Sequence, residues 1–234
     1  MKKPIWMLMV CIVVMLPLQA IHTAPAGDAA PLDDQSIAGE LQRGGYLLYM
    51  RHGEAAGQDQ PGVDFEDCSK QRNLTLLGSV QAGLIGERLR KLQIPVQTPV
   101  LASPYCRTRE TAELAFGKPN VEVMPHLAQI NVLSSDERTN EEERIILKKL
   151  AELFEIPVPQ GSNLVIVGHT FPAGKGLGEI PFMGTVVIKP NGAGKGYEII
   201  RRIRLDEWTD LFSKQADNNS PDRIGGVIAV SLLL

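Results

Sequence analysis

The stretch Tyr46–Gly53, YLLYMRHG, joins a continuous apolar run to an arginine, a histidine and a glycine. Tyr46–Met50 has the length and composition of a strand that is buried on both faces of a sheet. A pair of glycines precedes this run, and a polar segment follows it. We therefore expect a core strand whose last side chains, Arg51 and His52, emerge at its carboxyl end.

Two other segments repeat this arrangement. NLVIVGHT, residues 163–170, is a short β-branched run that ends in a glycine and His169. In PVLASPYCR, residues 99–107, a short strand is followed closely by Arg107. In an open α/β sheet, ligands bind outside the carboxyl ends of the strands. The chain has only four histidines, so two at strand ends favour a shared site. Its predicted members are Arg51, His52, Arg107 and His169.

The periodicity of the remaining chain predicts an α/β fold. Apolar residues recur at helical spacing after Thr75, an expected N-cap, and again in Glu141–Phe154. Two more helices are expected: one over Ser36–Gly44 with Ser36 as its N-cap, and one opened by Pro104 and closed by Gly117. A strand is expected over Val121–Met124. Thr185–Pro190 and Tyr197–Leu205 are expected to form a hairpin, and the chain to about residue 212 is expected to supply the closing strands of the sheet. Alternating helices and apolar strands are typical of a three-layer sandwich, with a mostly parallel central sheet and helices on both faces.

Two of these helices carry an apolar face that we expect to pack on the sheet. In the first, the periodic residues are Val80, Leu84, Ile85, Leu89 and Leu92. In the second, they are Ile145, Leu147, Leu150 and Leu153.

The composition fits a single domain, and it is compatible with a small anionic ligand. The chain has 234 residues, 44% of them apolar, which is enough for one good-sized core. The net charge is −3, the pI is about 5.9, and the basic residues form no stripe. Nucleic acid is therefore not an expected partner, whereas a few local arginines can still bind a small anion. The sequence has no Cys-x-x-Cys motif or His/Cys cluster, so no metal site is expected.

The N-terminus has the order of a secretory signal peptide. Lys2 and Lys3 precede an apolar stretch over Ile5–Leu18, and small residues follow. This stretch is shorter than the ~20 residues of a membrane-spanning helix, and an uncleaved anchor is the competing interpretation. The protein is thus expected to be secreted or extracytoplasmic, and to meet a membrane only transiently through this peptide.

The chain divides into four expected segments. These are a signal peptide over residues 1–26, a linker over 27–38, a domain over 39–215 and a tail over 216–234. The tail ends in an apolar run, IGGVIAVSLLL, for which an edge strand and a sticky disordered end are both open.

Removal of the leader leaves two cysteines, Cys68 and Cys106. An even pair in an exported protein favours a disulfide, with two free buried thiols as the alternative. Cys68 lies in the long polar loop Gly53–Asn73, and loops of this length in a compact domain are usually functional or disordered. Arg109, close to Cys106, is expected to be a helix-surface charge.

Four segments resemble, in order and spacing, the successive signatures of a known family. They are LLYMRHGEA, RNLTLLGSVQA, LASPYCRTRETA and LVIVGHT, from about residue 45 to residue 170. They look like the signatures of the histidine phosphatase superfamily, whose fold is called phosphoglycerate mutase-like. Without a large inserted domain, the chain is more similar to the compact branch of this superfamily than to its phytase-like branch.

The resemblance implies a role for each residue of the predicted site. His52 would be the nucleophile and would form a phosphohistidine. Arg51 and Arg107 would bind the phosphate oxygens, and His169 would donate a hydrogen bond to the same phosphate. No metal or other cofactor is implied.

Two further residues are candidates for substrate binding. Arg72 matches an arginine that often precedes the leucine–threonine block, so it would lie at the rim of the site or, alternatively, on a helix surface. Glu54 follows the first motif and would either orient His52 or face solvent.

The general acid is where the chain departs from the family pattern. Mutase-like members carry a glutamate where MPHLAQIN places Gln129, and an amide cannot donate a proton as an acid. Asp136, Glu137 and Glu141 follow downstream as candidates, each of which could equally be part of a solvated helix N-terminus. The departure favours hydrolysis over mutase chemistry.

The sequence thus predicts an exported phosphomonoesterase that hydrolyses a small phosphorylated substrate through a phosphohistidine at His52. A second interpretation is a phosphomutase, or a phosphatase dedicated to one sugar or lipid phosphate. A third is a non-catalytic module that binds a phosphorylated ligand. Export argues against glycolytic substrates, which stay inside the cell.

Overall fold

The computed structural model describes residues 34–134 and 138–218, with side chains over 37–134 and 138–211. The predicted signal peptide lies outside the described residues, as do most of the predicted linker and most of the tail. In the described part of the chain, no helix combines the length and apolar character needed to cross a membrane.

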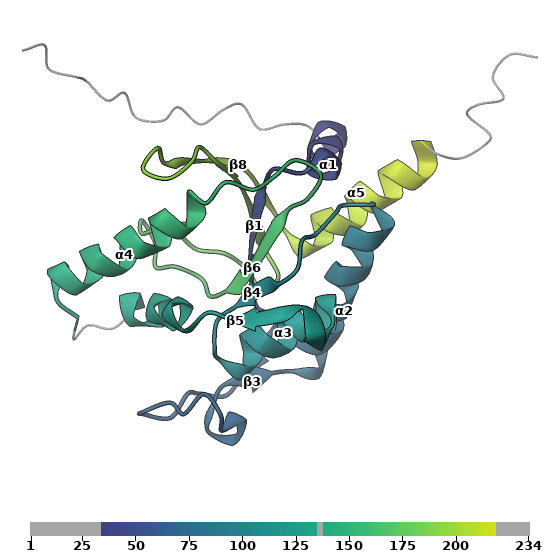
Figure 1. The fold of residues 1–234 in the computed structure, drawn as a ribbon. Coiled ribbons are helices and arrows are strands. Elements are labelled where there is room, and N and C mark those ends of the chain that lie inside the picture. Colours follow the sequence, from purple (N-terminus) through teal and green to yellow (C-terminus); the bar gives the residue numbers. More distant parts are fainter. Residues whose placement is uncertain (1–33, 135–137, 219–234) are drawn as a thin grey trace, which may run out of the picture.

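The fold is a three-layer α/β sandwich around a six-stranded sheet (Figure 1). The strands stand in the order β5-β4-β6-β1-β7-β8. Neighbours from β5 to β1 are parallel, whereas β7 and β8 extend the sheet in antiparallel orientation. The short strands β2 and β3 form a separate antiparallel pair. The predicted fold class is confirmed.

The strands are β1 (Leu47–Arg51), β2 (Ala55–Ala56), β3 (Asn73–Leu74), β4 (Val100–Ala102), β5 (Val121–Val123), β6 (Leu164–Gly168), β7 (Thr185–Pro190) and β8 (Tyr197–Ile203). The α-helices are α1 (Asp34–Arg43), α2 (Leu76–Lys91), α3 (Cys106–Phe116), α4 (Asn140–Phe154) and α5 (Leu205–Asn218). The 3₁₀ segments are η1 (Cys68–Lys70), η2 (Lys118–Asn120) and η3 (Pro125–Ser134).

Helices cover both faces of the sheet and enclose two hydrophobic cores. The helices α1, α2, α3 and α5 pack on one face, and α4 with η3 packs on the other (Figure 1). Along β1 the side chains alternate between the cores: Leu48 and Met50 belong to the first, and Leu47 and Tyr49 to the second. All four are fully buried. Because β1 is also hydrogen-bonded on both edges, its carboxyl end is a fixed point for the side chains that follow.

The N-terminal boundary of the domain differs from the prediction. Helix α1 begins at Asp34 rather than after Ser36, and Ile37 and Leu41 are fully buried in the first core. The last part of the predicted linker therefore belongs to the domain.

The C-terminal boundary also differs, because the chain closes with a helix instead of strands. Helix α5 continues to Asn218, past the predicted domain end at residue 215. Trp208 is fully buried, and its ring N–H donates to the hydroxyl of Thr185 at 3.2 Å. The spacing of Leu205, Trp208 and Leu211 is the signal for this helix in the sequence.

The helix caps agree in part with the sequence. Thr75 caps α2, because its hydroxyl accepts the backbone N–H of Gly78, and Gly117 ends α3 as expected. Pro104, however, lies before α3, whose N-cap is Tyr105. On α4 the buried residue is Ile146 instead of the predicted Ile145.

The buried face of α2 consists largely of small residues. Val80, expected in the core, is 60% exposed, and the buried positions in its place are Gly78 and Ala82. Further along, a Cβ on Gly86 would collide with the backbone carbonyl of Ala115 in α3. Glycine therefore lets the backbones of α2 and α3 approach closely. Periodicity of large apolar residues does not detect such a face.

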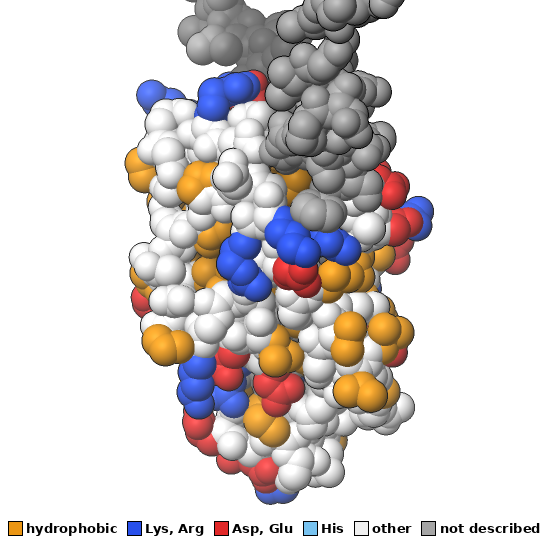
Figure 2. All heavy atoms as spheres, turned by 90° about the vertical axis from the view of Figure 1, so that its right-hand side faces the viewer, with side chains coloured by type: hydrophobic (Ala, Val, Ile, Leu, Met, Phe, Trp, Pro, Cys, Tyr) orange, Lys and Arg blue, Asp and Glu red, His pale blue; other side chains and the backbone are white. Residues whose placement is uncertain are grey.

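The outward side of α2 carries exposed hydrophobic side chains. Leu76 and Leu77, in its first turn, are 84% and 52% exposed. Figure 2, which views the face with α2 and α5, shows hydrophobic side chains in several separate groups between charged ones. Exposed leucines at scattered positions are common on protein surfaces.

Replacing Gly86 by alanine is expected to destabilise the fold by about 1–3 kcal/mol, because the added methyl group meets backbone atoms of α3. Gly83→Ala in the same helix is the matched control, since nothing lies within 4 Å of its added Cβ. This control is expected to be neutral or stabilising by up to about 1 kcal/mol, because alanine favours a helix over glycine. Urea unfolding measures both variants, and equal stabilities would contradict the described packing.

Candidate active site

Side chains singled out in the sequence converge at the carboxyl end of β1. This arginine–histidine cluster consists of Arg51, His52, Arg72, Arg107 and His169. His169 follows β6, which pairs with β1, and Arg107 lies in the first turn of α3. The rings of His52 and His169 are 5.6 Å apart, and the charges of Arg72 and Arg107 both act on Arg51. The predicted convergence of three strand ends is present.

His52 is held in one tautomer by the backbone. Its ring Nδ1 lies 2.7 Å from the carbonyl oxygen of Gly53. Because a carbonyl only accepts hydrogen bonds, Nδ1 carries the proton and Nε2 keeps a free lone pair. The side chain is buried, and this burial, together with the nearby arginines, lowers the pKa of His52 to about 3. The imidazole is therefore neutral at neutral pH.

In two arginines of the cluster, the buried Nε has no partner in the described structure. Arg51 donates from Nη1 to the carbonyl oxygen of Ile180 at 2.7 Å, and its buried Nε has no partner in the described structure. Arg107 donates from Nη1 to Asp59 at 2.9 Å and to the carbonyl of Arg72 at 3.2 Å, and its Nε is likewise unpartnered. Because Nε–H and one Nη–H point along the same edge, each edge fits two oxygens of one anion.

Positive charge is concentrated around Arg51. Burial, followed by the charges of Arg72 and Arg107, lowers the pKa of Arg51 to about 10. The ring of Phe182 lies against this charge, 4.0 Å from the guanidinium carbon of Arg51 and 5.7 Å from that of Arg72. Arg72 also donates from Nε and Nη2 to the carbonyl of Ala55. The cluster is thus an electropositive site suited to an anion.

His169 is buried at the end of β6 and presents one free ring nitrogen. Its Nε2 lies 2.8 Å from the hydroxyl of Ser103, and its Nδ1 has no partner among the described residues. When the serine hydroxyl donates to Nε2, Nδ1 carries the ring proton and is a donor.

The backbone of His169 is fixed by Tyr49. The tyrosine hydroxyl donates to the carbonyl of His169 at 2.8 Å and accepts its N–H at 2.9 Å. A Cβ on Gly168 would collide with this hydroxyl. The glycine before the second histidine is therefore required by a side chain of β1.

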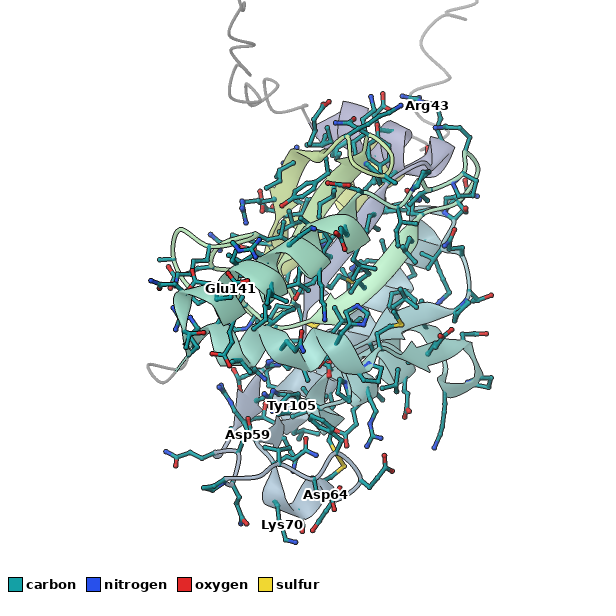
Figure 3. All side chains as sticks on the ribbon, turned by 60° about the vertical axis from the view of Figure 1, so that its left-hand side comes forward. Arg43, Asp59, Asp64, Lys70, Tyr105 and Glu141 are labelled. Atoms are coloured by element: carbon teal, nitrogen blue, oxygen red, sulfur yellow. A yellow bond between two sulfur atoms is a disulfide. The ribbon has the colours of Figure 1, made fainter. Side chains whose placement is uncertain are left out.

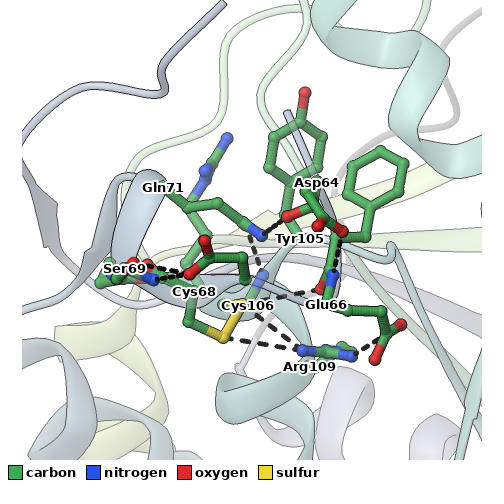
Figure 4. The surroundings of a disulfide bond; sticks show 12 residues. Asp64, Glu66, Cys68, Ser69, Gln71, Tyr105, Cys106 and Arg109 are labelled. Atoms are coloured by element: carbon green, nitrogen blue, oxygen red, sulfur yellow. Dashed lines mark hydrogen bonds and ion pairs between the residues drawn. A yellow bond between two sulfur atoms is a disulfide. The ribbon is translucent and has the colours of Figure 1, made fainter. Parts of the chain in front are cut away.

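The long loop between β1 and α2 is tied to α3 by a disulfide (Figure 4). The Cys68–Cys106 bond joins η1 to the first residue of α3, with 5.7 Å between the Cα atoms. The side chain of Gln71 accepts the N–H of Cys106 at 2.9 Å. Arg109 lies against the bond, with Nη2 3.4 Å from the sulfur of Cys106 and 3.7 Å from that of Cys68 (Figure 4). Arg109 is therefore a partner of the disulfide rather than the predicted surface charge.

Glu54 is not joined to His52 in the described structure. Its carboxylate accepts the hydroxyl of Thr75 at 2.9 Å, at the N-terminus of α2. Gly53 faces α2 as well, because a Cβ there would lie 2.5 Å from the carbonyl oxygen of Gly78. Glu54 is half-buried, and its contact with Thr75 anchors the segment after β1 to α2.

Of the three predicted acid candidates, Asp136 and Glu137 lie outside the described residues. Glu141 is exposed on α4, where the hydrogen bonds of Arg144 lower its pKa. A general acid needs the opposite shift. Figure 3 shows Glu141 on a different part of the molecule from Asp59 and Tyr105. The described residues also contain no group of three or more His, Cys, Asp or Glu side chains that could hold a metal ion.

Asp59 and Phe182 are members of the site surroundings for which the sequence carries no signal. Both lie in irregular segments, which have no hydrophobic periodicity and are not part of the four family-like motifs. Ser103, by contrast, lies within LASPYCRTRETA, so that motif already contained the partner of His169.

Comparison with known families identifies the class of the protein. Residues 47–163 match the family described as the histidine phosphatase superfamily (branch 1). The match spans half of the chain and contains His52, Arg72 and Arg107. The chain therefore belongs to the histidine phosphatase superfamily, and the resemblance seen in its motifs is confirmed. Its enzyme class is that of a phosphatase.

Solved structures of similar fold include the protein histidine phosphatase SixA complexed with tungstate, the alpha-ribazole phosphatase from Shigella flexneri, and a phosphoserine phosphatase variant from Entamoeba histolytica in complex with phosphoserine. Their identities to this chain are 16%, 18% and 14%, and their TM-scores are 0.44, 0.43 and 0.45. The matches cover 69%, 66% and 69% of this chain, and 97%, 94% and 98% of theirs. At these values the likenesses carry no argument about the reaction. Among curated proteins, none matches the chain.

The two cluster histidines are expected to reduce stability in acid. The pKa of His52 is lowered to about 3 and that of His169 well below its usual 6.5, in both cases chiefly by burial. The unfolded chain takes up protons near pH 6.5 while the folded protein does not, so stability falls as the pH drops from about 6.5 toward about 3. The slope is about 1.4 kcal/mol per pH unit for each histidine. Urea unfolding at about pH 7 and about pH 5 measures this loss.

The matched variant for this measurement is His52→Gln, which has no ring to protonate. Its loss of stability between the same two pH values should be smaller than that of the wild type by about 2 kcal/mol. An identical loss in the variant would contradict a neutral, buried His52.

Removing the disulfide is expected to destabilise the protein and to loosen the loop beside Arg107. The bond links residues 38 positions apart, for which loop-closure entropy gives up to about 4 kcal/mol. Cys68→Ser with Cys106→Ser should therefore unfold at lower urea concentration than the wild type. Treatment with a thiol reductant should change the wild type but leave the double variant unaffected. An unchanged urea midpoint in the double variant would contradict a stabilising bond.

Proposed function

We propose that the protein is an exported phosphomonoesterase that hydrolyses a small phosphorylated substrate through a phosphohistidine at His52. The observation that carries this proposal is the neutral tautomer of His52 beside two unpartnered arginine edges. A nucleophile with a free lone pair and a cradle for oxyanions are the two parts that phosphoryl transfer requires.

The first step forms the bond between His52 and phosphorus. The lone pair on Nε2 attacks phosphorus, the bond from phosphorus to the leaving oxygen breaks, and that oxygen takes up a proton and departs as an alcohol. Because Nδ1–H stays bound to the carbonyl of Gly53, the positive charge that develops on the ring is partly stabilised by that carbonyl. The low pKa of His52 keeps the nitrogen available even in mild acid.

The arginines hold the group that is transferred. The free edges of Arg51 and Arg107 bind oxygens of the phosphoryl group, and Nδ1–H of His169 donates to another. The negative charge of the transition state spreads over these oxygens, so fixed cations lower its free energy. Since these donors are already buried and placed, little reorganisation accompanies the reaction.

Hydrolysis completes the cycle. A water molecule attacks phosphorus, the phosphorus–nitrogen bond breaks, and its electron pair returns to Nε2 of His52. Inorganic phosphate leaves and the starting tautomer is restored. Splitting the transfer into two displacements replaces one difficult step by two easier ones.

Export is supported by two independent features. The order of basic, apolar and small residues at the N-terminus is that of a signal peptide. The Cys68–Cys106 disulfide fits an oxidising compartment, where such bonds form and persist.

Labelling with a ³²P-phosphorylated substrate and rapid quenching tests the covalent step. The wild type should carry labelled phosphate on His52 and should hydrolyse p-nitrophenyl phosphate, whereas His52→Ala should lose both by at least about 1,000-fold. His126→Ala is the control, because His126 lies in η3 outside the cluster, and it should retain activity.

The alternatives predict different results in the same assay. A phosphate-binding module would bind inorganic phosphate but show neither label nor turnover. A phosphomutase would return the label to the organic product instead of releasing inorganic phosphate. A folded wild-type protein with no turnover of any phosphomonoester from about pH 4 to about pH 9 would refute the proposed function.

A further inference from the structure

One carboxylate, that of Asp59, lies on the arginine–histidine cluster. Its Oδ1 is 2.9 Å from Nη1 of Arg107 and accepts the backbone N–H of Arg72 at 2.8 Å. The side chain of Arg107 is 4% exposed, whereas that of Asp59 is 27% exposed. In the described part of the chain, no other carboxylate forms an ion pair with Arg51, Arg72 or Arg107. Asp59 is therefore held on its inner side and accessible on the other.

Asp59 and a phosphoryl group do not compete for the same nitrogen atoms. Asp59 uses Nη1 of Arg107, and the unpartnered Nε belongs to the opposite edge of the same guanidinium. One planar guanidinium can bind two acidic groups on its two edges. Asp59 can therefore stay on Arg107 while a phosphoryl group binds at Nε of the same guanidinium, which keeps one carboxylate at the binding site.

The loop that carries Asp59 is anchored near this position. The disulfide holds Cys68 to the start of α3, and the side chain of Gln71 accepts the N–H of Cys106. The ring of Tyr105 lies 4.3 Å from the guanidinium carbon of Arg107. Asp59 itself is held by Nη1 of Arg107 and by the backbone N–H of Arg72.

From this geometry we propose that Asp59 is the general acid and base of the reaction. This inference rests on the proposed phosphohistidine mechanism. In the first step, the protonated carboxyl gives its proton to the leaving oxygen as the bond to phosphorus breaks, and the product leaves as an alcohol. In the second step, the carboxylate takes a proton from the attacking water as the phosphorus–nitrogen bond breaks. Asp59 then holds a proton again, ready for the next substrate.

Substrates that differ in their leaving group test the role. Asp59→Asn should lose at least about 100-fold in kcat/KM with phenyl phosphate, whose leaving oxygen needs a proton. With p-nitrophenyl phosphate, whose leaving group departs as a stable anion, the loss should stay below about 5-fold. The asparagine keeps an acceptor for both N–H groups, so thermal unfolding should show little change.

Asp64→Asn is the matched control, because it removes the same charge from the same loop. The side chain of Asp64 accepts the N–H of Glu66 and contacts no arginine of the cluster. Its kcat/KM should be unchanged with both substrates. If Asp59→Asn does not fold, the wild type alone decides: a shallow dependence of kcat/KM on the leaving group supports the proposal, and a steep one overturns it.

Other outcomes are distinct from these. Equal losses with both substrates would make Asp59 a positioning residue of Arg107, and a lower KM with unchanged kcat would make it a mere counter-ion. Either result overturns the proposal while labelled His52 in the wild type leaves the proposed function intact. An unlabelled wild type would instead refute the proposed function, and the role of Asp59 with it.

Discussion

The hydrogen bond from Nδ1 of His52 to the carbonyl of Gly53 is the contact on which the site depends. It decides which ring nitrogen carries the lone pair, and it requires the next peptide to turn back on the ring. That peptide is held by helix packing: the N–H of Gly53 donates to Thr111 of α3 at 3.0 Å, and its other side lies against Gly78 of α2. The packing of Gly53 against α2 and α3 therefore sets the tautomer of the proposed nucleophile, His52.

The arginine–histidine cluster lowers the stability of the free protein and favours the binding of an anion. The buried Nε atoms of Arg51 and Arg107 have no partner among the described residues, and the charges of the two arginines repel each other. Buried polar groups without partners usually cost free energy. Asp59 neutralises part of this charge, and the ring of Phe182 covers another part. A bound phosphoryl group would pair with the unpartnered Nε atoms and neutralise the remaining positive charge. Its binding would therefore stabilise the folded protein.

Much of the fold and part of the site could be predicted from the sequence, because their signals are local. A fully apolar strand that ends in Arg51 and His52 needs only its neighbours to be recognised, and the same holds for the strand before His169. The errors share a different cause. A face of glycine and alanine has no hydrophobic period, so the periodicity predicts burial for Val80, which is exposed. The prediction of closing strands misses helix α5, although Leu205, Trp208 and Leu211 have helical spacing.

The contact between Asp59 and Arg107 could not be predicted by such means. These residues are 48 positions apart, and the contact depends on the path of an irregular loop. Local patterns describe elements, whereas this contact is produced by the disulfide and by Gln71, which bring the loop onto α3. The cysteines could be paired from their number, but the pairing alone does not show which acid the closed loop presents.

The contact of Tyr49 with Gly168 has a consequence for the evolution of related chains. The hydroxyl that fixes the backbone of His169 occupies the space into which any side chain at position 168 would project. The two positions therefore accept change only as a pair: a larger residue at 168 requires the loss of the tyrosine hydroxyl or its displacement. Chains that share this strand pair should show correlated replacement at 49 and 168, even though the two residues lie in separate motifs.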